Sequence, residues 1–345
     1  MVRVACLLIP LCLVGCSNPA QAADYAGRAQ GASGMVPAVG ASGGAEAVRL
    51  WQDASIFQLV GGLIGSAHTR VLVEMYELGR ADLVQELGAA RRRGAEVRVI
   101  TDPTVGASRR GAAVLDSLAV PERAYPVDGG RHQIDHVKLL IADGEAAVGG
   151  MNWGRHSDRN HDYVLATRVR AEVDRLVRIF DQDWNLAGGR PAPLRAEAAE
   201  VAQTAPGEEI RAMLEAALNH ASQRALAEVY TLTDPEVIAG LVSAHRRGAL
   251  VRVLLDPNQA YNRHAYEVLR AGGVEVRWYP IPKGALLHAK IGLFDGELVL
   301  GSANWTRSGL GVNHELDIET GDPVARAAYA ARFAADWERS GGLAG

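Results

Sequence analysis

The sequence predicts an α/β protein made of two copies of one unit, each folded as an α-β-α sandwich around a central mixed β-sheet. Two observations lead to this prediction. The chain of 345 residues repeats itself, and each copy alternates helical segments with short apolar strands, as is typical of α/β folds.

The internal repeat is visible in several segments. Residues 71–76 (VLVEMY) recur as 225–230 (ALAEVY), and residues 92–99 (RRGAEVRV) recur as 246–253 (RRGALVRV). Near the end of each copy, an aromatic pair recurs at the same spacing: Phe180 and Trp184, then Phe333 and Trp337. The offset between the copies stays nearly constant, which indicates one ancestral unit used twice.

Each unit is expected to follow the same order of elements. An amphipathic helix (47–67, then 207–222) leads into an apolar strand that ends in Glu-x-Tyr. A second helix ends at Arg-Arg-Gly, since cations and glycine favour a helix C-terminus. A Val-Arg-Val strand, a third helix, several β-rich segments and a final helix with the aromatic pair follow. We assign repeat 1 to 48–187, a proline-containing linker to 188–206 and repeat 2 to 207–340.

The N-terminus is expected to direct export. Residues 1–16 combine a short cationic start with an apolar run too short to span a membrane, and the run ends in a lipobox-like Leu-Val-Gly-Cys. Cys16 would then carry the lipid anchor; secretion after cleavage at the small residues 20–22 is the alternative. Residues 17–47, rich in Ala, Gly and Ser, are expected to form a flexible tether. We therefore predict a membrane-anchored lipoprotein on the periplasmic or extracellular side.

The composition sets limits on function. With 48% hydrophobic and 22% charged residues, the chain has ordinary globular composition. The net charge of -4 makes a protein that binds nucleic acid mainly by neutralising phosphates less expected. All three cysteines lie within the export segment, so the remaining chain is expected to fold without a disulfide.

The chemistry is carried by one motif that occurs in both copies. Each copy has His-x-Lys-x4-Asp, followed at identical spacing by Gly-x-x-Asn-Trp; the residues are His136, Lys138, Asp143 and Asn152, then His288, Lys290, Asp295 and Asn304. Side chains two apart in a strand share a face, so His and Lys project together. An imidazole, an ammonium and an amide per copy suit a phosphate.

Lysine usage supports this interpretation. The chain contains only three lysines, at 138, 283 and 290, and every other cationic side chain apart from histidine is arginine. A compact ammonium differs physically from a planar guanidinium, so retention of lysine at both motif positions points to a specific role.

The paired motifs resemble those of the phospholipase D superfamily over essentially the whole chain beyond the tether. The resemblance implies two related halves that pack with pseudo-two-fold symmetry and share one site. It further implies that His136 attacks phosphorus to give a phosphohistidine, and that His288 protonates the leaving oxygen. Asp162 and Glu315 match the acidic residues that orient the histidines in the family.

Other roles follow from the same resemblance and from the residue types. Lys138, Asn152, Lys290 and Asn304 would hold the phosphate oxygens, together with the hydroxyl of Ser302, for which the first copy has Gly150. Asp143 and Asp295 belong to the catalytic motif, although holding the turn after the strand suits them better. His161 and His314 are paired by the duplication, and a structural role suits them as well as a functional one. The apolar loop 280–287 could touch lipid or be buried.

We expect a phosphodiesterase that hydrolyses or exchanges phospholipid head groups at a membrane. A metal-independent endonuclease, a phosphatidyl transferase similar to cardiolipin synthase and, least expected, a non-catalytic phosphate-binding protein are the alternatives. No cofactor or metal is expected, because two lysines beside the histidines would repel a cation. Since both motifs lie in one chain, a monomer would suffice for a complete site.

Overall fold

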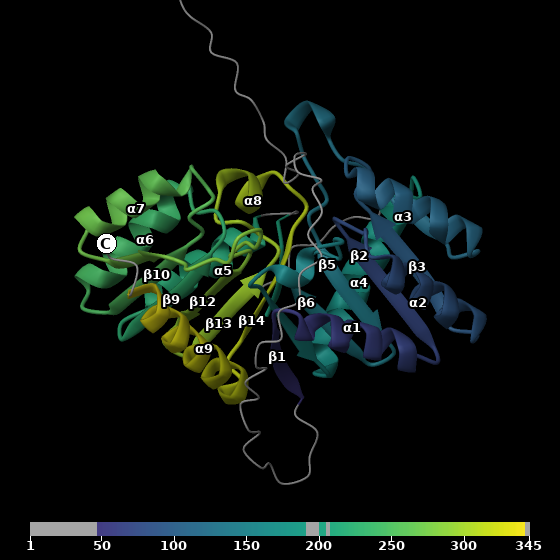
Figure 1. Ribbon diagram of the computed structural model, residues 1–345, viewed down its shortest axis with the longest axis horizontal. Helices are drawn as coiled ribbons and strands as arrows, with labels where there is room; N and C mark the ends of the chain where they lie inside the picture. The colour runs from purple at the N-terminus through teal and green to yellow at the C-terminus, as the bar shows by residue number, and fades with distance from the viewer. Residues whose placement is uncertain (1–46, 191–199, 205–207, 342–345) are drawn as a thin grey trace, which may run out of the picture. The chain divides into compact units, whose positions relative to one another are not determined.

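A computed structural model describes residues 47–190, 200–204 and 208–341. Together these residues belong to one compact unit, which contains both copies of the repeat. Figure 1 shows the first copy in purple to teal and the second in green to yellow, each with helices against a sheet. The predicted signal segment, all but the last residue of the predicted tether, and most of the linker fall outside the described residues.

The first copy forms a seven-stranded mixed sheet in the order β1-β7-β6-β5-β2-β3-β4. Strands β2, β3 and β4 run parallel, and the remaining neighbours pair antiparallel. The strands are β1 (Val48–Gln52), β2 (Arg70–Met75), β3 (Glu96–Thr101), β4 (Glu122–Ala124), β5 (Lys138–Ala142), β6 (Glu145–Gly149) and β7 (Tyr163–Thr167). The helices are α1 (Ser55–Ser66), α2 (Ala81–Arg92), α3 (Gly106–Ser117) and α4 (Arg170–Ala187), with 3-10 turns at Gly129–Arg131 and Ser157–Arg159.

The second copy repeats this topology in a sheet of order β11-β10-β9-β12-β13-β14-β8. Its strands are β8 (Val201–Gln203), β9 (Arg224–Val229), β10 (Leu250–Leu255), β11 (Glu275–Trp278), β12 (Lys290–Phe294), β13 (Glu297–Gly301) and β14 (Leu316–Thr320). Its helices are α5 (Glu209–His220), α6 (Pro235–Arg246), α7 (Asn262–Ala271), α8 (Arg307–Gly311) and α9 (Pro323–Gly341). The predicted fold class, a duplicated α/β protein with mixed sheets, is confirmed.

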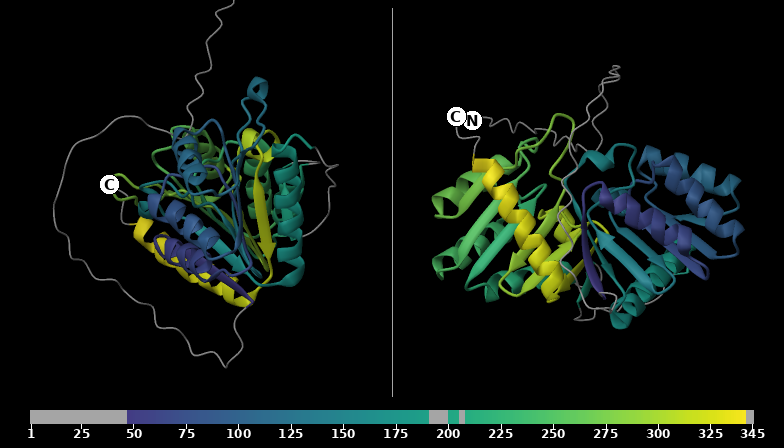
Figure 2. Two further views of the ribbon diagram at one scale, coloured as in Figure 1. Left: turned by 90° about the vertical axis from the view of Figure 1, so that its right-hand side faces the viewer. Right: turned by 60° about the horizontal axis from the view of Figure 1, so that its bottom comes forward.

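Three apolar clusters form the layers. One packs α1, α2 and α3 on the outer face of the first sheet, and a second does the same with α5, α6 and α7 on the second sheet. The third is shared: it contains side chains of β5 and β12, and of α4 and α9, from both copies. Because this shared cluster joins the inner faces of both sheets, the halves form one body; the right-hand view of Figure 2 shows them side by side.

Two predicted elements need correction. The first helix was expected to begin at residue 47, but residues 48–52 form β1, which pairs antiparallel with β7. The alternating Val-Arg-Leu-Trp-Gln pattern suits an edge strand, and the helix begins only at Ser55. In the predicted linker, Val201–Gln203 forms β8, which pairs with β14 and completes the second sheet.

Candidate active site

The first motif lies at the start of β5. Lys138 is the first residue of the strand and His136 lies two residues before it, so β5 positions both. The Lys138 ammonium donates to the backbone carbonyl of His136 and lies 5.0 Å from the ring centroid of Tyr76. Both motif side chains are buried, and His136 Nε2 has no hydrogen-bond partner among the residues that the structure describes. The unpartnered nitrogen is therefore the ring atom available to a substrate.

The second motif has the same arrangement at the start of β12. The Lys290 ammonium donates to the backbone carbonyl of His288 and lies 2.9 Å from its Nδ1. It also lies 5.2 Å from the ring centroid of Tyr230. Tyr76 and Tyr230 were not among the predicted site residues, yet each flanks a motif histidine. Their recurrence in the Glu-x-Tyr segment of each copy was the signal that could have identified them.

Each motif histidine is held by a carboxylate from the opposite half. The Nδ1 of His136 lies 2.8 Å from Glu315 Oε2, and the Nδ1 of His288 lies 2.8 Å from Asp162 Oδ2. Sequence analysis identified both carboxylates but not this exchange between halves. Because neither histidine has its orienting carboxylate within its own half, each motif is complete only when the halves are packed together.

The two carboxylates are supported differently. Glu315 accepts the Ser302 hydroxyl at 2.6 Å and the Asn313 amide at 3.0 Å. The Ser302 oxygen also accepts the backbone N–H of Leu316. Its hydroxyl proton is thus committed to Glu315, and a role as phosphate ligand stays a prediction. In the first half, Gly150 occupies the equivalent position, and a Cβ there would lie 2.3 Å from Asp162 Oδ1. The shorter Asp therefore requires glycine beside it, whereas the longer Glu accommodates and uses a serine.

Electrostatics join the two motifs into one site. Burial, followed by the charges of Lys138 and Lys290, holds the pKa of His136 well below its usual value. Burial and Lys290 lower the pKa of His288 to about 3, and Lys138 contributes to the same decrease. Both lysines thus act on both imidazoles, although they belong to different halves. Both rings are neutral in the unliganded protein, and a bound phosphate anion would raise both pKa values.

The protonation state of Glu315 decides whether Nε2 of His136 is free. Burial raises the pKa of Glu315 to about 7, so this carboxyl changes its charge near neutral pH. When Glu315 is ionised it accepts a hydrogen bond from Nδ1–H and leaves the lone pair on Nε2 available; when it is protonated it donates to Nδ1, and the neutral ring then carries its proton on Nε2. A neutral imidazole with one oriented nitrogen is what nucleophilic attack requires.

The asparagines follow the strands that neighbour the motif strands. Asn152 comes after β6, which pairs antiparallel with β5, and Asn304 comes after β13, which pairs with β12 in the same way. They therefore lie at the same ends of the sheets as the histidines. The Oδ1 atom of each amide is buried without a hydrogen-bond partner among the described residues. These free oxygens can accept a hydrogen bond, whereas a contact with a phosphate oxygen would come from the NH2 group of each amide.

Asp143 and Asp295 do not belong to the catalytic machinery, which corrects their inclusion among the site residues. Each lies beyond the opposite end of the motif strand from the histidine, in the left-handed backbone region. Asp143 accepts the backbone N–H groups of residues 68, 69 and 70, and Asp295 accepts those of 222, 223 and 224. Both carboxylates hold a turn.

Two buried groups of side chains could in principle bind a metal ion. They are Glu74, Asp183 and His314 in one case, and His161, Glu228 and Asp336 in the other, with ligand atoms within 4.8 Å of one another. In each group the imidazole is already paired with both carboxylates. His161 and His314, the two histidines paired by the duplication, thus each lie in one of these groups. Cys16, the predicted lipidation site, lies outside the described residues.

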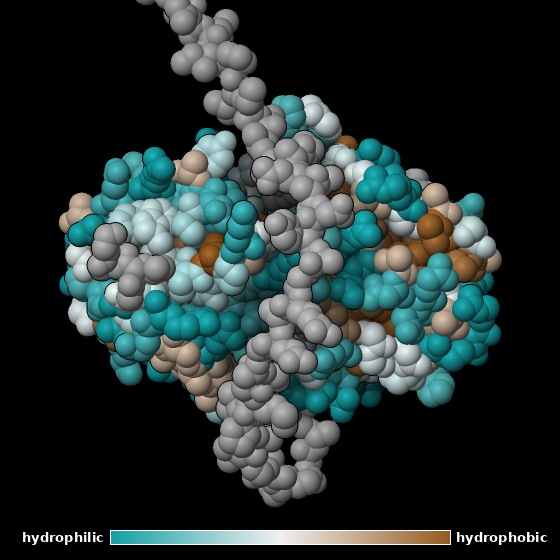
Figure 3. Space-filling model, in the orientation of Figure 1, coloured by the Kyte–Doolittle hydropathy of each residue, from teal (hydrophilic) through white to brown (hydrophobic). Residues whose placement is uncertain are grey.

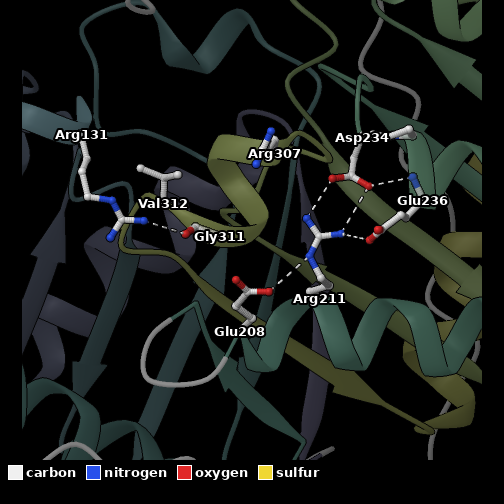
Figure 4. A pocket seen from close by; sticks show the side chains of 9 residues that line it. Arg131, Glu208, Arg211, Asp234, Glu236, Arg307, Gly311 and Val312 are labelled. Carbon is white, nitrogen blue, oxygen red and sulfur yellow. Dashed lines mark hydrogen bonds and ion pairs between the residues drawn. The ribbon is translucent and has the colours of Figure 1, made fainter.

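A polar pocket of about 530 Å³ lies beside α8, the short helix that follows Asn304 in the chain (Figure 4). Arg211 is neutralised there by Asp234, Glu236 and Glu208. Arg131, from the first half, donates to the backbone carbonyl of residue 311. The exposed Arg307 also lines the pocket, and the described residues include no ion-pair partner for it. None of the predicted site residues lines this pocket.

The apolar loop before His288 is partly buried. Ala285 and Leu287 are buried, and residues 282–284 at its tip are exposed. Burial is therefore the better interpretation of its apolar side chains. Among the described residues, the structure contains no helix that is both long and apolar enough to span a membrane.

Comparisons with known proteins agree with this geometry. Residues 61–184 and 214–337 each match the family described as cardiolipin synthase, PLD-like domain. The mitochondrial cardiolipin hydrolases of Chlamydomonas reinhardtii and Xenopus laevis are 30% and 35% identical over 112 residues. That segment is 32% of this chain and 49% and 52% of those proteins, so the chain spans about half the length of the curated relatives it matches.

Solved structures show the same fold at low identity. Phosphatidylserine synthase of Haemophilus influenzae superposes with a TM-score of 0.69 at 11% identity, covering 85% of this chain and 86% of that one. Polyphosphate kinase of Porphyromonas gingivalis gives a TM-score of 0.62 at 16% identity, covering 84% of this chain and 50% of that one. At these identities the likeness concerns the fold alone.

Proposed function

The chain belongs to the phospholipase D superfamily, and from this premise we propose that it cleaves or exchanges phospholipid head groups through a phosphohistidine intermediate. The observation that carries the proposal is the reciprocal pairing of each motif histidine with a carboxylate of the other half. This pairing brings two oriented imidazoles and two lysines into one electrostatic environment.

In the proposed first step, His136 Nε2 attacks phosphorus and the bond from phosphorus to the head-group oxygen breaks. His288 takes up a proton when the bound phosphate anion raises its pKa, and it gives this proton to the departing oxygen. The unpartnered Nε2 and the pairing of Nδ1 with Glu315, which in its ionised form accepts from Nδ1–H, support His136 as nucleophile. The pairing of His288 with Asp162 supports it as acid, because a carboxylate stabilises an imidazolium.

In the second step, water or an alcohol attacks phosphorus and gives a proton to His288, which is now neutral. The bond between phosphorus and His136 breaks, and both imidazoles return to their starting states. Lys138 and Lys290 would stabilise the charge on the non-bridging oxygens in both steps, with Asn152 and Asn304 beside them.

A phospholipid is the proposed substrate class. Curated relatives that match part of the chain are named cardiolipin hydrolases, and the net charge of -4 disfavours a protein that mainly binds polyanions. On the face shown in Figure 3 the described surface is mostly hydrophilic, with its most hydrophobic atoms gathered between α2 and α3. A metal-independent endonuclease remains the principal alternative, followed by a phosphatidyl transferase, because the same site would serve both.

The cellular location is part of the proposal. The lipobox-like segment ending at Cys16 supports export and membrane anchoring through a lipidated cysteine. Radiolabelled palmitate should be incorporated into the expressed wild-type chain and not into Cys16→Ala. Equal labelling of the two chains would refute the anchor without affecting the proposed chemistry.

The substrate proposal is tested by offering purified protein several phosphodiesters under the same conditions. Vesicles of phosphatidylcholine, phosphatidylglycerol or cardiolipin are compared with single-stranded DNA, and the His136→Ala variant serves as control for contaminating activity. We expect release of a head group, or its exchange when an alcohol is added, from at least one lipid. Cleavage of DNA with all lipids left intact would replace the proposal with the endonuclease.

A further inference from the structure

Two histidines outside the motifs cross between the halves. His314 belongs to the second half, but its Nε2 lies 3.1 Å from Asp183 and 3.4 Å from Glu74 of the first half. Its ring stacks on Tyr125 with centroids 4.5 Å apart. Glu74, Asp183 and Tyr125 are called the first nest, and both carboxylates and His314 are buried within the protein.

The second crossing is the pseudo-symmetric counterpart of the first. His161 belongs to the first half, and its Nε2 lies 3.2 Å from Glu228 and 3.2 Å from Asp336 of the second half. Its ring stacks on Tyr279 with centroids 5.0 Å apart. Glu228, Asp336 and Tyr279 are called the second nest. The nearby carboxylates raise the pKa values of His161 and His314 well above the usual value, although burial opposes this.

Each crossing histidine directly precedes a carboxylate that holds a motif histidine. The backbone of His314 accepts from His136 N at 2.8 Å and donates to the carbonyl of residue 134 at 2.8 Å. The backbone of His161 makes the same pair of bonds with His288 and residue 286. In such extended segments, neighbouring side chains point to opposite faces. The histidine side chain therefore lies in the nest on one face of the segment. On the other face, the carboxylate of the next residue contacts the motif histidine.

We propose that His314 and His161 are positioning residues: His314, held in the first nest, places Glu315 against His136, and His161, held in the second nest, places Asp162 against His288. The proposal rests on the proposed function and extends it, because it assigns a separate positioning residue to each of the two catalytic histidines. His314 acts on the nucleophile, and His161 acts on the acid.

Each nest holds its histidine through the attraction between carboxylates and an imidazolium, in addition to packing. Glutamine fills a similar volume but carries no charge. In the first nest it would remove the imidazolium that lies between Glu74 and Asp183. In the second nest it would remove the imidazolium beside Glu228, although Arg332 and Arg339 would still pair with Asp336. The segment would then be displaced from the nest, and the following carboxylate would move with it. A displacement of about 1 Å at a catalytic group can lower a rate by roughly 100-fold.

The two positioning roles can be separated by the leaving group. A p-nitrophenyl ester departs as a weakly basic phenolate that needs little protonation, whereas an alkyl ester depends on the general acid. We compare His314→Gln and His161→Gln on both esters and measure leaving-group release in a single turnover, which isolates the first chemical step. His264→Gln, on the exposed surface of α7, is the matched control.

For His161→Gln we expect a loss of about 100-fold on the alkyl ester and of only a few-fold on the p-nitrophenyl ester. For His314→Gln we expect a similar loss on both esters, because attack by His136 precedes departure of either group. Wild-type rates in both variants, or an equal loss on both esters in His161→Gln, would overturn the proposal. Loss of activity in His136→Ala tests the proposed function separately.

Double variants, in which one carboxylate of the nest is also replaced by an amide, keep the test valid if a single substitution prevents folding. In His314→Gln/Glu74→Gln and His161→Gln/Glu228→Gln, the surplus buried carboxylate becomes a neutral amide. Each pair should fold, as judged by circular dichroism and size exclusion, and should recover at least 10-fold of the activity lost in the single variant. Folded double variants without such recovery would contradict positioning by charge.

Discussion

A substitution at Gly150 tests whether the carboxylate of Asp162 must lie where the structure places it. A Cβ at Gly150 would lie 2.3 Å from Asp162 Oδ1, whereas non-bonded atoms prefer a separation of about 3.5 Å. In Gly150→Ala the carboxylate must therefore retreat by roughly 1 Å. It cannot do so freely, because Oδ1 accepts the backbone N–H of Tyr163 and Oδ2 lies 2.8 Å from His288 Nδ1.

The expected effect is a loss of about 100-fold in kcat/KM, or about 2.7 kcal/mol in the activation free energy. The assay is hydrolysis of an alkyl phosphodiester, with the unfolding midpoint in urea measured on the same preparation. Ser302→Ala is the matched control: this position already carries a Cβ, and the substitution removes the hydroxyl's hydrogen bonds to Glu315 and to the backbone N–H of Leu316 without adding an atom. We expect a loss of less than 10-fold for the control.

A transplant distinguishes displacement of the carboxylate from general damage. Gly150→Ser/Asp162→Glu introduces into the first half the serine–glutamate pair that the second half uses, and it should recover most of the lost activity. The reasoning would be refuted if Gly150→Ala kept wild-type kcat/KM. It would also be refuted if the transplant, while folded, stayed as inactive as the single variant.

The remaining predictions concern stability, pH and metal. Asp143→Ala should destabilise the protein by about 2 kcal/mol, because three backbone N–H groups lose their acceptor and residue 143 has left-handed backbone angles. The kcat/KM of the folded protein should stay the same. Urea unfolding measures the first effect and initial rates measure the second. Burial raises the pKa of Asp317 from 3.8 to about 7. The folded state therefore binds more protons than the unfolded state, and this contribution to stability is complete below pH 3.8 and is lost as pH rises through about 7. Relative to Asp317→Asn, the wild type should lose on the order of 2 kcal/mol of unfolding free energy between pH 5 and pH 8, and a constant difference would contradict the assignment. Treatment with EDTA should leave hydrolysis unchanged because the two lysines supply the positive charge, whereas a loss restored by zinc would favour a metal site.

Much of the fold could be predicted because the same sequence patterns for strands and helices occur in both copies of the repeat. The strands at 71–76 and 97–99 and their second copies carry clear apolar patterns, and the structure places β2, β3, β9 and β10 there. Strand β1 was missed because five alternating residues directly before a helix fit either interpretation. Its assignment depends on its partner β7, which is more than a hundred residues away in the chain.

The site residues could be predicted, but not all of their connections. Composition and spacing identified both histidines and both lysines, and the resemblance to the phospholipase D superfamily identified both carboxylates. The exchange of Glu315 and Asp162 between halves depends on backbone pairing across the interface, which no local pattern encodes. The hydrogen bond from Ser302 to Glu315 was missed for a related reason, because it joins residues that no local pattern connects.

The central claim is that the two halves form one site, in which His136 and His288 act on the same phosphorus atom. The most direct measurement is the hydrolysis rate of His136→Ala and His288→Ala, each purified as a folded protein and assayed on an alkyl phosphodiester. A single shared site predicts that each variant retains less than about 1% of the wild-type rate. Retention of about half the rate by either variant would mean that each half works alone, and it would contradict the shared site.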